Sequence, residues 1–217
     1  MTLQQLREIV NVLIELDEVD NLTKLPEIKA MKKILQERSN IDKEVVGKFC
    51  VAAALNNYQE FISKDPERDS YWGRFVNWTI KNGQDIPPWK RFPQVKQKRF
   101  LRFKNSGLWS ERLLEMGSKN LLFALAMVMG QNHTDKTICF APLVLSRWAS
   151  VINHPFEIYN NHPLPVDSRI DRLLKQFPTL LRDLPDVLNQ VNEKRHNLGK
   201  RPLSVSDFDS WAWQLNL

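Results

Sequence analysis

The chain has 217 residues, of which 42% are hydrophobic and 26% are charged. This length predicts one domain or two closely packed lobes, and the apolar content excludes a disordered chain. Seven glycines are few for an all-β protein, and two cysteines cannot form a disulfide framework, which favours a reducing compartment. The absence of a long apolar run or a targeting signal leads us to expect a soluble, cytoplasmic protein.

The charge is distributed unevenly along the chain. Residues 1–70 hold 10 basic and 13 acidic side chains, whereas residues 71–217 hold 21 basic and 12 acidic ones. The whole chain has a net charge of +6 and a sequence pI near 9.3. A pI above about 9 with clustered basic residues is typical of nucleic-acid binding, because each neutralised phosphate releases counterions. The alternative is a basic surface that only keeps the protein in solution.

The first third of the sequence predicts helices. Apolar residues recur there at three- and four-residue spacing, which places amphipathic helices at 2–17, 28–36, 45–62 and 71–80. No segment of the chain shows the strict apolar–polar alternation of a half-buried strand. The fold class expected is therefore all-α.

The stretch from Ile86 to Ser110 differs from its surroundings. Its prolines at 87, 88 and 93 interrupt regular helix, and Lys90 to Lys104 holds seven basic residues and no acidic one. Aromatic residues lie among these basic ones, which suits contact with a phosphate backbone and with unstacked bases. The alternative is a solvated helix face whose aromatics point inward. The residues predicted to contact a nucleic-acid backbone are Lys90, Arg91, Lys96, Lys98, Arg99 and Arg102.

The second half of the sequence predicts further helices at 110–129, 136–152, 184–196 and 206–215, with another that begins at Asp167. A polar turn at 130–135 separates the first two, and Thr134 is a candidate N-cap for the helix that follows. Pro142 lies inside that helix and should kink it. The segment 153–166, rich in Asn, His and Pro, is expected to be irregular.

Most familiar catalytic motifs are absent from the sequence. Its four histidines and two cysteines lack the spacing of metal ligands, and neither a glycine-rich phosphate loop nor a G-x-S-x-G motif is present. We therefore expect neither a metal nor an organic cofactor. A lysine and an aspartate remain as candidates.

Lys136 opens a helix and precedes the apolar sequence Thr137–Ala141. The positive end of a helix dipole and partial burial both disfavour an ammonium ion, so both lower the pKa of a lysine in this place. A neutral amine can act as a nucleophile and form a Schiff base. The alternative is an ordinary surface lysine.

Asp167 follows Pro165 and precedes an amphipathic helix, which predicts an N-cap. Capping and catalysis are compatible, because one carboxylate oxygen of the cap would be free to face a developing cation. A cap with no catalytic role is the alternative.

Three segments resemble a known family of enzymes. Lys136–Ala141 (KTICFA), Pro165–Ile170 (PVDSRI) and Asp209–Trp213 (DSWAW) resemble, in this order, motifs of the archaeal GO glycosylases. These are 8-oxoguanine DNA glycosylase/lyases of the helix-hairpin-helix superfamily. The resemblance covers most of residues 110–217. The turn 130–135 departs from the superfamily because it holds one glycine instead of a G-x-G hairpin, which leaves open which groups bind the phosphate.

The resemblance implies a fold, a reaction and a set of site residues. It implies a single domain over residues 1–217, with two helical lobes around a central cleft and an atypical helix-hairpin-helix at about 115–152. Lys136 would be the nucleophile and Asp167 the catalytic carboxylate. The residues implied to contact the flipped base are Phe140, Asp209, Trp213 and Trp72. Ordinary core packing is the alternative for Phe140 and Trp213.

The function expected is excision of 8-oxoguanine from double-stranded DNA by a monomer, which would be associated with the nucleoid through its DNA. Lys136 would form a Schiff base at C1′, and β-elimination would then cleave the strand. One alternative is a glycosylase for another lesion. The other is a non-catalytic helical nucleic-acid-binding protein, in which Lys136 contacts phosphate and Asp167 only caps its helix.

Overall fold

The computed structural model describes residues 3–17, 22–56 and 93–215, and every regular element in these segments is a helix. The sequence-based prediction of an all-α fold is therefore confirmed. The α-helices are α1 (Leu3–Glu15), α3 (Pro26–Glu37), α4 (Lys43–Leu55), α6 (Pro93–Lys104), α7 (Ser118–Met129), α8 (Lys136–Val151), α9 (Ser168–Gln176), α10 (Leu180–Asn197) and α11 (Val205–Gln214). Two 3₁₀ turns, η2 (Gly107–Trp109) and η3 (Leu113–Glu115), precede α7.

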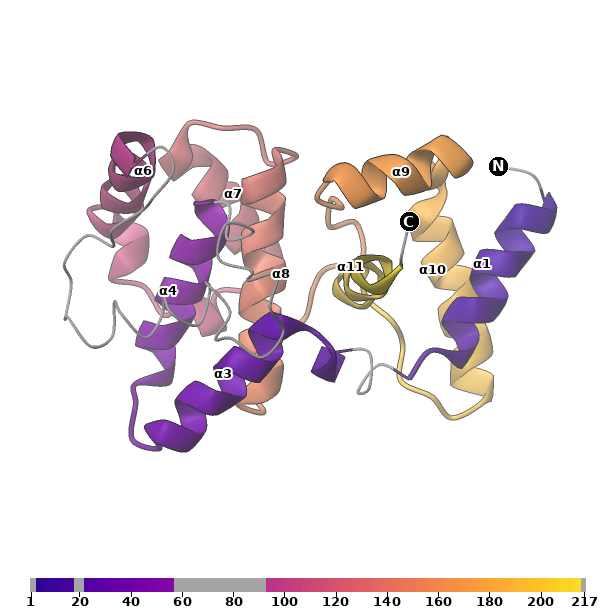
Figure 1. Cartoon of the computed structure of the whole chain (residues 1–217), viewed down its shortest axis with the longest axis horizontal. Coiled ribbons are helices and arrows are strands. Elements are labelled where there is room, and N and C mark those ends of the chain that lie inside the picture. Colours follow the sequence, from indigo (N-terminus) through magenta and orange to yellow (C-terminus); the bar gives the residue numbers. More distant parts are fainter. Residues whose placement is uncertain (1–2, 18–21, 57–92, 216–217) are drawn as a thin grey trace.

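The helices form two groups that lie side by side (Figure 1). One group contains α3, α4, α6, α7 and α8, and the other contains α9, α10, α11 and the N-terminal helix α1. The chain thus begins in the second group, crosses to the first, and returns after α8. Helix α1 packs along α10, so the two ends of the sequence share one lobe.

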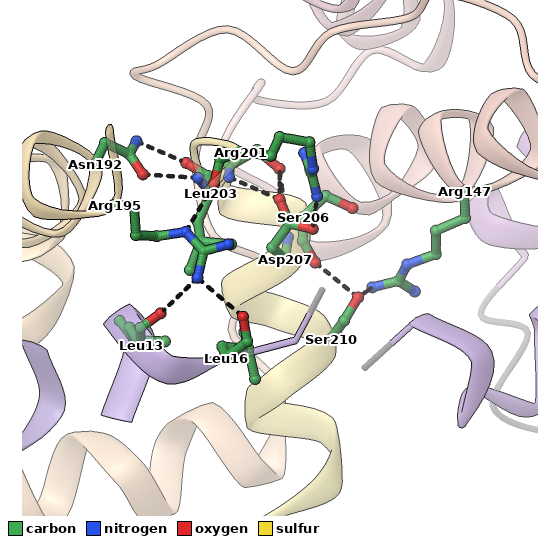
Figure 2. A network of polar contacts seen from close by, with 11 residues as sticks. Leu13, Leu16, Arg147, Asn192, Arg195, Arg201, Leu203, Ser206, Asp207 and Ser210 are labelled. Atoms are coloured by element: carbon green, nitrogen blue, oxygen red, sulfur yellow. Dashed lines mark hydrogen bonds and ion pairs between the residues drawn. The ribbon is translucent and has the colours of Figure 1, made fainter. Parts of the chain in front are cut away.

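Arg195 of α10 fixes α1 in that lobe. Its guanidinium is fully buried and donates to the carbonyl oxygens of Ile14 and Leu16, each at 2.9 Å, and of Leu13 at 3.3 Å. Figure 2 shows the bonds to Leu13 and Leu16. The last carbonyls of a helix have no partner within the helix, and a buried arginine can satisfy several of them together. Burial of this cation is tolerated because its donors are occupied.

Helix α8 packs against α3, α4 and α7 of the first group, most extensively against α4. Asp42 caps α4 by accepting from the N–H groups of Glu44 at 2.9 Å and Val45 at 3.2 Å. The two helices approach closely at Gly47, where an added Cβ would lie 3.0 Å from Leu145 Cδ1. The core formed here holds the candidate lysine helix rigidly.

Several predicted boundaries differ from the structure. The helix predicted at 110–129 is replaced by the 3₁₀ turn η3 and then α7, because Gly117 has a φ of 75° that interrupts regular helix before Ser118. Helix α10 begins at Leu180, upstream of the predicted 184, and contains Pro185. The end of the helix predicted at 45–62, and all of the one predicted at 71–80, lie outside the described residues.

Both cysteines, Cys50 and Cys139, are buried and free. Within the described segments no helix has the length and apolar character needed to cross a bilayer.

Candidate active site

Helices α7 and α8 form a hairpin whose turn spans residues 130–135. Gly130 ends α7 in the left-handed conformation, with φ 61° and ψ 43°, and the Gln131 N–H returns to the Ala126 carbonyl at 3.0 Å. Asp135 is the N-cap of α8, so the prediction that Thr134 takes this place is wrong. The Asp135 carboxylate bonds back to the Asn132 N–H at 3.2 Å and makes no cap bond with the first turn.

Lys136 is the first residue of α8, as predicted, and its side chain is half-buried. Burial lowers the pKa of its ammonium group, and Arg169 acts in the same direction. The charges of Asp167 and Asp209 oppose this shift. Among the described residues the amine has no hydrogen bond or ion pair. It is therefore available for reaction once it loses its proton.

Asp167 caps α9, which confirms the prediction. Its Oδ1 accepts from the N–H groups of Arg169 at 2.9 Å and Ile170 at 3.1 Å. Its second oxygen is not free as predicted, because Oδ2 pairs with the Arg169 guanidinium. Burial raises the pKa of Asp167, but the bond from Ile170 and the charge of Arg169 outweigh it and hold this pKa below its ordinary value. The carboxylate thus stays ionised at neutral pH.

The structure brings Lys136, Asp167 and Asp209 together from three helices. Helix α8 borders one group of helices, whereas α9 and α11 belong to the other (Figure 1). The negative charges of Asp167 and Asp209 both raise the pKa of Lys136, and the charge of Asp167 raises the pKa of Asp209. The candidate site consists of one amine with a lowered pKa and two carboxylates of unlike environment whose charges act on it.

Asp209 is buried and pairs with Arg147 of α8, at 2.6 Å between Oδ2 and Nη2. The same guanidinium pairs with Glu27 of α3 at 2.7 Å and bonds to Ser210 Oγ at 3.2 Å (Figure 2 shows the Ser210 contact). Burial raises the pKa of Asp209 to about 6, although Arg147 acts in the opposite direction. A buried cation shared by two carboxylates ties α3, α8 and α11 into one unit.

The residues implied to contact the base are only partly described. Phe140 is 6% exposed, and the Arg147 guanidinium lies 5.5 Å from its ring centroid. Trp213 belongs to α11, but the structure does not describe its side chain. Trp72, Lys90 and Arg91 lie outside the described residues. Stacking of a base by Phe140 or Trp213 stays a prediction.

The basic helix α6 lies beside the hairpin turn. Arg99 donates to Gln131 Oε1 at 2.6 Å and to Thr137 Oγ1 at 2.8 Å. The guanidinium of Arg102, whose side chain is exposed, lies over Gly130, where a Cβ would come within 3.1 Å of Nη2. Lys98 is exposed, whereas Lys96 is only 5% exposed and therefore less accessible to a phosphate. Burial lowers the pKa of Lys96.

The aromatic residues described on α6 point inward. Phe100 and Phe103 are fully buried, and their ring centroids lie 6.2 Å and 5.4 Å from that of Trp109. The alternative of inward-pointing aromatics is thus correct for these two residues, and they are not available to stack on bases.

Among the described residues, no cluster of histidine, cysteine and carboxylate side chains could hold a metal ion. A cavity of about 590 Å³ lies between Ser146, Asn160 and Asn189, and none of the three candidate residues Lys136, Asp167 and Asp209 lines it.

A protein-family model described as AGOG, N-glycosylase/DNA lyase, matches residues 10–198. The chain belongs to this family. The resemblance to this family is thereby confirmed, although the third motif, 209–213, lies beyond the matched residues, and the chain is a DNA glycosylase/lyase that acts on damaged DNA. Helices from both groups lie within the matched range.

A solved structure has the same fold as this AGOG chain. The crystal structure of Pa-AGOG, an 8-oxoguanine DNA glycosylase from Pyrobaculum aerophilum complexed with 8-oxoguanosine, superposes with a TM-score of 0.69. The match covers 98% of this chain and 87% of that one, at 17% sequence identity. A search of curated proteins gives no match.

Sequence reasoning missed four residues that the structure places around the candidate site. Arg169 lies within the motif that identified Asp167, and Arg147 lies two turns after Phe140 on the buried face of α8, where a charged residue is unusual. Glu27 and His162 gave no local signal, because their partners are distant in the sequence.

Proposed function

We propose that this AGOG protein excises 8-oxoguanine from double-stranded DNA, with Lys136 as the nucleophile and Asp167 as the carboxylate that assists it. The observation that carries the proposal is the half-buried amine of Lys136, whose pKa is lowered and which lies in the field of the ionised Asp167. Flipping of the damaged nucleotide would bring its C1′ to this amine.

The proposed reaction has two stages. The Lys136 nitrogen bonds to C1′ while the bond from C1′ to the base breaks, and the ionised Asp167 stabilises the positive charge on the sugar. The departing base takes a proton, and sugar-ring opening gives a Schiff base between Lys136 and C1′. Removal of a proton from C2′ then expels the 3′ phosphate by β-elimination, and water later releases the lysine. None of these steps requires a cofactor.

Recognition of the base is assigned to groups around Asp209. Its carboxylate would accept hydrogen bonds from the base, and Phe140, Trp213 and Trp72 would supply stacking surfaces. Arg147 supports this role because it holds the Asp209 carboxylate in a single geometry. The opening of the pocket would lie between the two lobes of a single domain.

Binding of the DNA backbone is assigned to α6 and to the hairpin turn 130–135. Arg99 and Arg102 lie against this turn, where the superfamily's G-x-G hairpin would bind a phosphate. Positive groups next to the start of α8 suit a phosphate at this position. Lys98 extends the basic surface. Contacts of Lys90, Arg91 and Lys96 with the backbone stay predictions. The monomeric state and the cytoplasmic, nucleoid-associated location are likewise predictions.

A panel of duplexes tests the proposal. Each duplex carries 8-oxoguanine, another oxidised base, uracil or no lesion, and products are separated with and without alkali so that base removal and strand cleavage are counted independently. We expect both products from the 8-oxoguanine duplex in preference to the others. Preference for another lesion would overturn the substrate assignment and leave the family's activity intact.

A further inference from the structure

His162 links the two halves of the active site, and neither the family match nor the motifs assign it a role. Its Nε2 lies 2.7 Å from the carbonyl oxygen of Cys139, and the ring is 4% exposed. Because a carbonyl only accepts, Nε2 carries the proton and donates it. The bond therefore connects two parts of the chain. One is the segment that precedes Asp167, and the other is the first turn of α8, which begins at Lys136.

The imidazole is held neutral in this position. Its Nδ1 is buried and has no partner among the described residues, so a second proton there would be an uncompensated buried charge. Burial lowers the pKa of His162 to about 4, although the bond to the Cys139 carbonyl acts in the opposite direction. The titratable groups that face the ring are Tyr159, edge-on at 5.3 Å, and Cys139, whose pKa is raised to about 12. Both stay neutral near pH 7.

The chain on either side of this bond has little freedom. Cys139 lies one helical turn after Lys136, in a helix whose core side chains are fully buried. On the other side, Asp167 follows His162 through Pro163-Leu-Pro-Val166. Alternate prolines restrict their own φ and keep the preceding residues extended, so this short segment behaves as a stiff spacer. Leu164 and Pro165 are also buried, which removes further slack.

Other features surround this bond. Pro142 has no N–H for the carbonyl of Ile138, four residues earlier, so α8 loses one helical hydrogen bond there, and His162 bonds to the next carbonyl, that of Cys139. A second bond, from the Tyr159 N–H to Ser118 Oγ at 3.0 Å, holds the same segment against the start of α7.

We propose that His162 is a positioning residue of the glycosylase/lyase reaction, whose bond to the Cys139 carbonyl sets the separation of Lys136 and Asp167. This inference rests on the proposed roles of those two residues. Loss of the bond lets the spacer shift, which lowers the rate of reaction at bound DNA and leaves DNA affinity unchanged. A displacement of about 1 Å at such a site is enough to slow a reaction up to about a hundredfold.

The test uses the full chain and a duplex with a single abasic site, so that it does not depend on which base is the lesion. Single-turnover strand cleavage is measured against protein concentration, which separates the maximal rate from the concentration at half-maximal rate. His162→Phe keeps a ring and removes the donor, whereas His162→Gln keeps an N–H donor near the position of Nε2. Ile158→Ala is the control, since Ile158 is buried in the same segment and its side chain has no group that donates or accepts a hydrogen bond.

We expect a maximal rate lowered about ten- to a hundredfold in His162→Phe, at an unchanged half-maximal concentration. His162→Gln should recover most of the rate, and Ile158→Ala should lose stability but keep its rate. If His162→Phe does not fold, Pro163→Gly decides instead, because it loosens the spacer at a half-exposed position and should lower the rate in the same way.

Two results would overturn the role of His162 but not the proposed function. One is a wild-type rate in folded His162→Phe or Pro163→Gly. The other is an equal loss of rate in His162→Phe and Ile158→Ala when both lose the same stability. Lys136→Gln distinguishes these from failure of the proposed function. Cleavage that persists in Lys136→Gln would remove the nucleophile and this inference with it. Cleavage lost in Lys136→Gln but retained in His162→Phe would remove only the role of His162.

Discussion

Arg147 and Asp209 form a buried ion pair, with Nη2 and Oδ2 2.6 Å apart and side-chain exposures of 0% and 4%. The pair connects α8, which carries Lys136, to α11. Even with this cation beside it, burial keeps the pKa of Asp209 at about 6. The carboxylate proposed to bind the base is therefore ionised at neutral pH and becomes protonated in mildly acidic solution.

Base excision is expected to weaken as the pH falls through about 6, because protonated Asp209 loses an acceptor for the base. Asp167 does not titrate in this range, since its pKa is held below its ordinary value. Single-turnover excision of 8-oxoguanine from pH 5 to pH 8 measures the effect. The acidic limb centred near pH 6 should be missing from the residual activity of Asp209→Asn, which should then vary with pH only through the protonation of Lys136. The same limb in that variant would assign the titration to another group.

Arg147→Met is expected to destabilise the protein by about 3–5 kcal/mol, because it leaves Glu27 and Asp209 as buried carboxylates without their cation. Urea unfolding measures this change. Replacing Glu27 by Gln in the same chain should recover part of the loss. In any Arg147→Met protein that folds, the midpoint of the acidic limb should move above about pH 6. An unfolding free energy within about 1 kcal/mol of the wild type would contradict the account of this pair.

Replacement of Asp167 separates capping from catalysis. Asn keeps an oxygen for the N–H groups of Arg169 and Ile170, so Asp167→Asn should retain the cap and lose only the ion pair with Arg169. Its melting temperature should change by a few degrees, as expected for a loss of about 1 kcal/mol. Excision should fall about 10²–10³-fold without the negative charge. Asp167→Ala should lose both stability and activity. Near-native excision in folded Asp167→Asn would make the carboxylate purely structural.

The local features of the site could be predicted from the sequence, and its long-range contacts could not. The start of α8 at Lys136 and the cap at Asp167 depend on neighbouring residues, so the helix periodicity and the Pro-x-Asp sequence were sufficient. The Glu27–Arg147 pair joins residues 120 positions apart. The placement of α1 in the C-terminal lobe depends likewise on Arg195, and no local pattern encodes such a partner.

Two errors have local physical causes. Thr134 and Asp135 are both good N-cap residues, and the choice between them depends on the turn, where the Asp135 carboxylate binds the Asn132 N–H. The apolar residues before Ser118 suggested a longer helix, but the positive φ of Gly117 ends regular structure there.

The exposed charges of α6 should contribute to DNA affinity without reading its sequence. Reversal of Lys98 and Arg102 to Glu should weaken binding to lesion-containing and undamaged duplexes alike, and lower the salt dependence by about two phosphate contacts. Lys32→Glu with Lys33→Glu on α3 is the matched control, because it changes the net charge equally on another helix. Equal effects of the two double variants would indicate that only net charge matters.

The central claim is that Lys136 forms a covalent Schiff base with the sugar. Borohydride reduces such an intermediate to a stable amine, so protein and DNA migrate together on a denaturing gel. Wild-type protein mixed with borohydride and an 8-oxoguanine duplex should give this adduct, whereas Lys136→Gln should give none while it still binds the duplex. An adduct of wild-type yield in Lys136→Gln would contradict the account, because the nucleophile would then be another amine.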